Sequence, residues 1–161
     1  MERLYARFVR ESNSIEGIKR DPTDAELAEF ERFMLLPAIS VGELENFVKV
    51  YQPDARLRDT AGLNVRVGDY YPPIGGPQIR EGLAAILKTL SNAYDDHRRY
   101  QSLHPFSDGN GRSGRALWAW QYRNLSLGFL HRWYYQSLSG SPRYVYLPLS
   151  VESTYGVVVP E

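Results

Sequence analysis

Residues 104–115 read HPFSDGNGRSGR and interrupt two segments whose residues recur at helical spacing. The segment before them, 94–101, and the segment after them, 117–124, each predict one face of a helix. Glycines inside the stretch let the backbone turn with its amides pointing inward, and the helix that begins near Arg112 adds unpaired N–H groups at the same place. The stretch therefore predicts an anion-binding loop between two helices.

The side chains of this loop suit a nucleotide phosphate. Arg112 and Arg115 are three residues apart, so both guanidinium groups can reach one polyphosphate. Asp108 supplies one carboxylate, which suits magnesium because this ion takes one or two protein carboxylates and completes its shell with phosphate oxygens and water. His104, with an ordinary pKa of about 6.5, can accept a proton from a hydroxyl nucleophile at neutral pH. Together these residues predict a phosphate-transfer site.

The rest of the chain is predicted to be mainly helical. Period-two alternation begins at Leu63, and a turn at Gly68-Asp69 predicts a small β-hairpin over about 63–74. We expect one all-α domain over 1–142 with this hairpin, followed by a tail, 143–161, that either forms a strand or is poorly ordered. Further helices are predicted over 3–16, from a capping box at Thr23 to Pro37, from Ser40 to Pro53, along 79–90 and around 129–134.

Composition narrows the classes of partner. The chain has 161 residues with 19 basic and 19 acidic side chains, so its net charge of +0 argues against nucleic acid or a membrane surface as a partner. It has no cysteine, which excludes a disulfide scaffold, a thiol nucleophile and a cysteine zinc site. The first residues contain no apolar targeting segment, and no run of about 18 apolar residues occurs. We expect a soluble cytoplasmic domain with no membrane contact.

Residues 104–115 also resemble the signature of the Fic (filamentation induced by cAMP) family, H-x-F-x-[D/E]-G-N-G-R-x-x-R, and match every specified position. The resemblance implies a Fic-type helical bundle and a magnesium-dependent protein adenylyltransferase, which transfers AMP from ATP to a Tyr, Ser or Thr hydroxyl of a target protein. By position it makes His104 the catalytic base, Asp108 the magnesium ligand and Phe106 a buried anchor of the loop. The ATP-binding residues that it implies are Gly109, Asn110, Gly111, Arg112 and Arg115.

Two upstream stretches extend the resemblance, which covers about residues 12–140. The sequence NVRVGDYYPP (64–73) resembles the family's flap, which clamps the target as an added strand. The sequence SNSIEG (12–17) resembles the inhibitory motif [S/T]-x-x-x-E-[G/N], carried here on an N-terminal helix over about 3–17. It implies class II self-inhibition in which Glu16 pairs with Arg115. The target-binding flap residues that the resemblance implies are Val67, Gly68, Asp69, Tyr70 and Tyr71.

Other functions remain open from the sequence. The same site could remove AMP with a water that Glu16 orients, or transfer another nucleotide or phosphate-containing group. A module of a different class, which senses a nucleotide without catalysis, would also keep the loop. Tyr70 and Tyr71 also fit ordinary aromatic residues of an edge strand. The sequence names neither the target protein nor the nucleobase, and a homo-oligomer is compatible with it.

Overall fold

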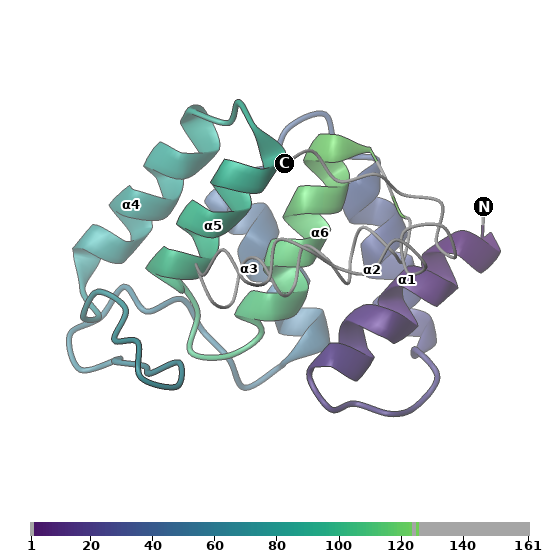
Figure 1. Cartoon of the computed structure of the whole chain (residues 1–161), viewed down its shortest axis with the longest axis horizontal. Helices are drawn as coiled ribbons and strands as arrows, with labels where there is room; N and C mark the ends of the chain where they lie inside the picture. The colour runs from purple at the N-terminus through teal and green to yellow at the C-terminus, as the bar shows by residue number, and fades with distance from the viewer. Residues whose placement is uncertain (1, 124, 126–161) are drawn as a thin grey trace.

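The computed structural model describes residues 2–123 and 125, and this part of the chain forms six helices without a strand of more than one bridge. The predicted all-α class is therefore confirmed for the described residues. The helix predicted around 129–134 and the tail, 143–161, lie outside them. The helices, shown in Figure 1, are α1 (Glu2–Ile15), α2 (Asp24–Met34), α3 (Val41–Tyr51), α4 (Pro77–Lys88), α5 (Ala93–Leu103) and α6 (Asn110–Tyr122).

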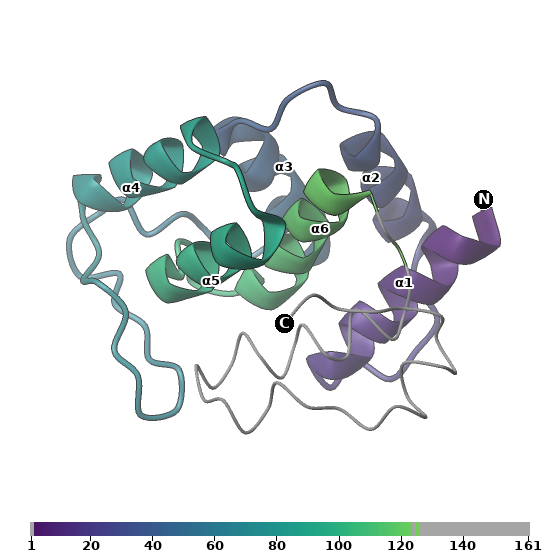
Figure 2. The ribbon, with the colours of Figure 1, turned by 45° about the horizontal axis from the view of Figure 1, so that its top comes forward.

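Helix α6 lies at the centre of the bundle. It contacts α1, α2, α3 and α5, while α4 packs on α5 and α3 at the side of the molecule. The connection between α5 and α6 lies at the same end of the bundle as the last turn of α1 and the loop between α3 and α4 (Figures 1 and 2). Three segments that are far apart in the sequence thus come together at one end.

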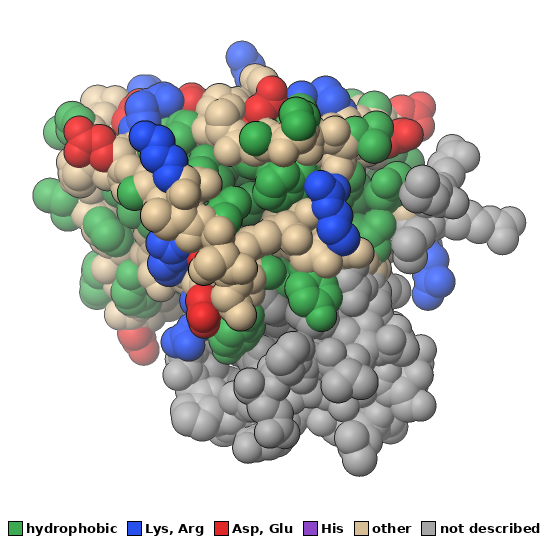
Figure 3. Space-filling view, turned by 90° about the horizontal axis from the view of Figure 1, so that it is seen from above, with side chains coloured by type: hydrophobic (Ala, Val, Ile, Leu, Met, Phe, Trp, Pro, Cys, Tyr) green, Lys and Arg blue, Asp and Glu red, His purple; other side chains and the backbone are tan. Residues whose placement is uncertain are grey.

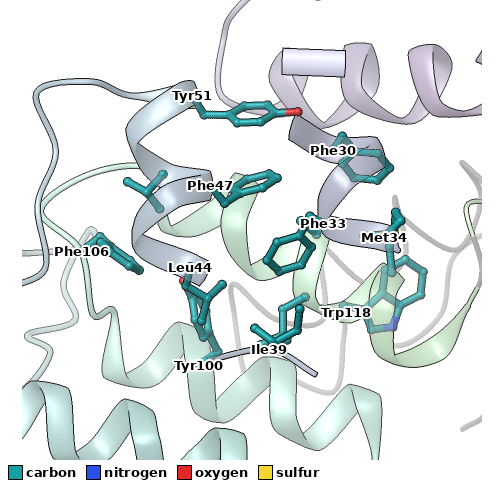
Figure 4. Close-up of a cluster of buried hydrophobic side chains, with 14 of the residues drawn as sticks. Phe30, Phe33, Met34, Ile39, Leu44, Phe47, Tyr51, Tyr100, Phe106 and Trp118 are labelled. Carbon is teal, nitrogen blue, oxygen red and sulfur yellow. The ribbon is translucent and has the colours of Figure 1, made fainter. Parts of the chain in front are cut away.

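Aromatic side chains fill the core between α2, α3 and α6. Figure 4 shows Phe33 from α2 against Phe47 from α3, with ring centroids 5.1 Å apart. Phe47 in turn stacks on Tyr51 at 4.3 Å, and Trp118 of α6 is only 1% exposed. Burying one such side chain stabilises the fold by roughly 1.5–3 kcal/mol, so this cluster holds α6 in place beneath the site.

Local capping explains where the helices begin. The capping box predicted at Thr23 is confirmed, since Glu26 N donates to Thr23 Oγ1 (3.1 Å) and Thr23 N donates to Glu26 Oε1 (2.8 Å). At the start of α3 only half of such a capping box forms. Ser40 Oγ accepts from Glu43 N, but the carboxylate of Glu43 pairs with Arg32 instead of returning to the cap.

The hairpin predicted over about 63–74 is reduced to one antiparallel bridge. Val67 and Tyr70 exchange two backbone hydrogen bonds of 2.9 Å around the turn that starts at Gly68, whose φ is +58°. Two consecutive prolines, 72 and 73, follow the bridge and have no N–H to donate, so pairing cannot continue along that arm. A second isolated bridge, which the sequence did not predict, joins Leu57 to Phe106.

The face seen in Figure 3 mixes Lys and Arg side chains with Asp and Glu side chains and hydrophobic ones, and no large patch of one charge gathers there. This mixture agrees with the balanced composition. Among residues 2–123 and 125, no helix is long and apolar enough to cross a membrane.

Candidate functional site

His104 occupies an unusual backbone conformation at the end of α5. Its φ of +50° and ψ of +62° are left-handed, a region that costs a residue other than glycine roughly 1–2 kcal/mol. Pro105 disfavours a further helical turn, and the carbonyl of His104 accepts a 2.7 Å hydrogen bond from Arg58 Nε. The chain therefore leaves α5 at His104 and turns toward α6.

The environment of the His104 imidazole favours its neutral form. The side chain is partly buried, and its Nδ1 is a buried atom that has no hydrogen-bond partner among the described residues. Burial lowers the pKa of His104 below its usual value, and the charge of Arg58 acts in the same direction. A neutral imidazole at pH 7 is the form that can accept a proton.

Asn110 fixes the loop that follows. Its Oδ1 accepts from Phe106 N at 2.8 Å, and its Nδ2 donates to Phe106 O at 2.7 Å. Phe106 is 1% exposed, so the loop is anchored as expected. Because both atoms of the Asn110 amide are engaged in this way, only the backbone N–H of Asn110 is available for an anion.

The N-terminus of α6 is open to a ligand. Gly109 precedes it with φ of +81°, and no side chain caps the helix. The first-turn N–H groups of an α-helix have no acceptor within the helix, and the helix dipole adds partial positive charge at this end. Gly109 N itself donates to Asp108 Oδ1 at 2.7 Å, and the exposed Asp108 lines the pocket.

Arg112 is held from behind by the end of α3. Its Nη1 donates to Tyr51 O (3.2 Å), its Nη2 donates to Gln52 Oε1 (3.0 Å), and its guanidinium lies over the Tyr51 ring. The residue is 4% exposed, yet Nε has no partner among the described residues. The two bonds use only part of the guanidinium's five N–H donors, and Arg112 lines the pocket, so it has further donors for a ligand there.

Arg115 is bound to α1. Its Nε donates to Ser12 Oγ and its Nη2 to Ser12 O, both at 2.9 Å, and Nη2 also lies 2.6 Å from Glu16 Oε1. The side chain of Arg115 is 2% exposed, whereas that of Glu16 is 37% exposed at the pocket surface. A Cβ at Gly111 would overlap Glu16 Oε1, so the carboxylate lies directly against the first turn of α6. The contact that the sequence motif implied is present in the structure.

These groups surround one pocket of about 630 Å³. Its wall combines the end of α1, the loop around 65–70, the last turns of α5 and residues 104–115. Four Arg and two carboxylates line it, so guanidinium groups outnumber carboxylates by two. The charge of the pocket favours an anionic ligand. The lining charges are Arg66, Arg98, Arg112, Arg115, Glu16 and Asp108.

The predicted flap residues are only partly brought to this pocket. Val67 and Tyr70 line it, and Tyr70 OH donates to Ser102 O at 2.7 Å, which ties the loop to α5. Gly68 and Asp69 form the turn and do not line the pocket. Tyr71 points to solvent with 69% of its surface exposed.

The donor set fits a magnesium ion that is shared with a ligand. Within residues 2–123 and 125, no three His, Cys, Asp or Glu side chains gather into a metal-binding group. Asp108 offers a single carboxylate beside an anion-binding helix end, and phosphate oxygens and water would have to complete the coordination.

Arg58, Gln52, Arg66 and Arg98 belong to this site or support it, and the sequence did not point to them. Arg58, Gln52 and Arg98 lie in segments without a motif, whereas Arg66 lies in the flap-like stretch 64–73 but was not singled out there; only the fold brings these side chains to residues 104–115. No family model matches this chain, and no solved structure matches it. Fold and site together define a helical domain with an arginine-lined pocket at the N-terminus of α6.

Proposed function

We propose that this chain is a protein adenylyltransferase, an enzyme of the Fic type that transfers AMP from ATP to a hydroxyl of a target protein. The observation that carries the proposal is the pocket itself. There a neutral imidazole, an uncapped helix N-terminus, one carboxylate and two arginines of a single twelve-residue stretch face the same space. A nucleoside triphosphate and a hydroxyl nucleophile need these groups together.

In the proposed reaction the hydroxyl oxygen of the target attacks the α-phosphorus of ATP. His104 accepts the hydroxyl proton, the bond between the α-phosphorus and the bridging oxygen breaks, and pyrophosphate leaves with the bond electrons. The helix N-terminus and Arg112 stabilise the charge on the phosphates. Magnesium held by Asp108 and the phosphate oxygens would neutralise further negative charge. The loop over 63–74 acts as the flap that receives the target segment.

Glu16 restrains this activity in the proposal. Its carboxylate occupies Arg115 and lies against Gly111, in the space where the terminal phosphate would otherwise bind. ATP bound beside Glu16 has its α-phosphate out of line with the attacking hydroxyl and reacts slowly.

The test compares α-labelled and γ-labelled ATP, with magnesium and a cell lysate, in wild type, Glu16→Gly and Glu16→Gly with His104→Ala. We expect protein to acquire the α-label only, more strongly in Glu16→Gly, and to lose it in the double variant. Self-labelling is scored as well. Label from γ-ATP would indicate phosphate transfer, and binding of ATP without any label would indicate a nucleotide-sensing module.

Removal of AMP is a second candidate because the carboxylate of Glu16 is partly exposed inside the pocket, where it can orient a water. Incubation of AMP-modified lysate protein with the chain distinguishes the two. Release of AMP that is lost in Glu16→Gly indicates removal, whereas label gained in the same variant indicates transfer.

A further inference from the structure

Arg58 is a charged side chain whose exposed fraction is 0%, and no carboxylate within the described residues pairs with it. Fully buried arginines are rare unless their charge is compensated. Here backbone carbonyls compensate it. The guanidinium donates to His104 O (2.7 Å), Pro73 O (2.8 Å), Leu103 O (2.9 Å) and Leu63 O (3.1 Å).

Two of these carbonyls belong to the end of α5. The last carbonyls of a helix have no partner within it, and Pro105 has no N–H to supply one. Nε and Nη2 of Arg58 take over this role at His104 and Leu103, at the negative end of the helix dipole. The backbone of Arg58 adds a third link, because its N–H donates to Pro105 O at 2.8 Å.

The other two carbonyls lie at the two ends of the loop 63–73. Nη1 of Arg58 donates to Leu63 O and to Pro73 O, so a single nitrogen joins both arms of the loop. Gly76 N also donates to Arg58 O at 2.9 Å, which fixes the start of α4 to the same residue. The base of the loop therefore depends on the guanidinium that also holds the carbonyl of His104.

We propose that Arg58 is a positioning residue that holds the left-handed backbone of His104 and the base of loop 63–73 in a fixed relation at the mouth of the pocket. The proposal rests on the proposed function only where it concerns the rate of transfer. The placement of the two segments can be tested without any reaction.

The planar fork of Arg is needed for this arrangement. Its donors point along fixed directions from one plane, whereas the ammonium of Lys is a compact charge that cannot reach four separated carbonyls. In Arg58→Lys the buried charge is kept and the geometry is lost. A displacement of His104 of about 1 Å is expected to lower kcat on the order of 10- to 100-fold. The KM for ATP should change by less than about threefold because the phosphate contacts lie on α6.

The kinetic experiment uses the full chain with Glu16→Gly, and compares Arg58→Lys with the matched control Arg56→Lys. Arg56 lies two residues away on the same segment and is exposed, with no side-chain contact to the pocket. We expect a fall of kcat in Arg58→Lys alone. Thermal unfolding checks that both variants are folded. Equal kcat values in the two folded variants would overturn the proposal.

Two measurements do not depend on turnover. In nuclear magnetic resonance spectra, Arg58→Lys should shift the imidazole signals of His104. The same variant should accelerate backbone amide exchange across 63–73, whereas Arg56→Lys should leave both readouts unchanged. If no variant labels protein, the proposed function fails and these two readouts still decide the role of Arg58. Unchanged His104 signals in a folded Arg58→Lys chain would refute it.

Should Arg58→Lys not fold, the wild-type chain provides the test. The Nε–H of Arg58 is buried and bonded to His104 O, so it should exchange with solvent far more slowly than the Nε–H of Arg56. Exchange at the same rate for both would mean that the guanidinium does not hold His104.

Discussion

The contact between Glu16 and Arg115 makes a quantitative prediction about which nucleotides the pocket distinguishes. If the carboxylate stands where the terminal phosphate of ATP would bind Arg115, then Glu16→Gln should strengthen the binding of ATP. ADP has no γ-phosphate to compete for that position, so its affinity should change little. The ratio of the ATP and ADP affinities therefore reports on this single contact.

The magnitude follows from the geometry. A hydrogen bond between charged groups contributes roughly 1.5–3 kcal/mol, and the 2.6 Å distance from Arg115 Nη2 to Glu16 Oε1 is that of such a bond. Arg115 is buried, but 37% of the Glu16 side chain is exposed, so solvent screening lowers the value to about 1–2 kcal/mol. Removing the charge should therefore tighten ATP binding by about 5- to 30-fold.

The assay is titration calorimetry with magnesium, in a His104→Ala background so that nothing is transferred. Glu16→Gln is compared with Glu31→Gln, a matched change at an exposed carboxylate on α2. A double-mutant cycle with Arg115→Gln completes the test, because Glu16→Gln should have almost no effect once Arg115 is gone. Equal gains for ATP and ADP, or a gain that persists in Arg115→Gln, would refute the competition for Arg115.

Three further changes test the loop and the core. Asn110→Ala removes both hydrogen bonds to Phe106 and leaves buried partners unpaired, so it should lower the free energy of unfolding by about 2–4 kcal/mol in urea titration. In Gly75→Ala the new Cβ would lie 2.5 Å from a backbone oxygen, so we expect a loss of more than about 1 kcal/mol and a lower thermal midpoint; an unchanged midpoint would contradict this close approach. Burial lowers the pKa of His97 to about 3. Below about pH 6.5 the unfolded chain therefore binds a proton at His97 that the folded chain does not, so the free energy of unfolding should fall by about 2 kcal/mol from pH 7 to 5. Burial also lowers the pKa of His104, which therefore acts on the pH dependence of stability in the same direction. The difference in stability between wild type and His97→Gln, measured against pH, isolates the contribution of His97. Parallel stability curves for the two chains would contradict the burial of His97 as a neutral group.

Much of the fold could be predicted because its signals are local. The start of α2 follows from the side chain of Thr23 and the carboxylate of Glu26, which lie within one helical turn of each other. The end of α1 follows from Gly17, because its φ of +81° is a left-handed conformation that glycine adopts readily and that ends a helix. Periodicity likewise predicted α5 and α6 around the stretch 104–115, and α6 begins inside that stretch at Asn110, two residues before the predicted start.

The hairpin shows where local signals were insufficient. Alternation over 63–67 predicted paired strands, but the carbonyls of Leu63 and Pro73 accept from Arg58 instead of from an opposite strand. Pro72 and Pro73 end the pairing along one arm, and a distant side chain binds the carbonyls at both ends of the loop, which the pattern of one segment cannot report. The predicted role of this loop in target binding stays a prediction.

The sequence by itself determined which chemical groups residues 104–115 contain, because this twelve-residue stretch carries its own glycines, carboxylate, imidazole and arginines at fixed spacing. Only the tertiary structure decided what each of these groups contacts. Arg112 is held by α3 and Arg115 by α1, through bonds that span 60 to 103 residues of chain. The physical reason is range: spacing along a helix sets which side chains share a face, whereas the packing of that face brings in partners from anywhere in the chain.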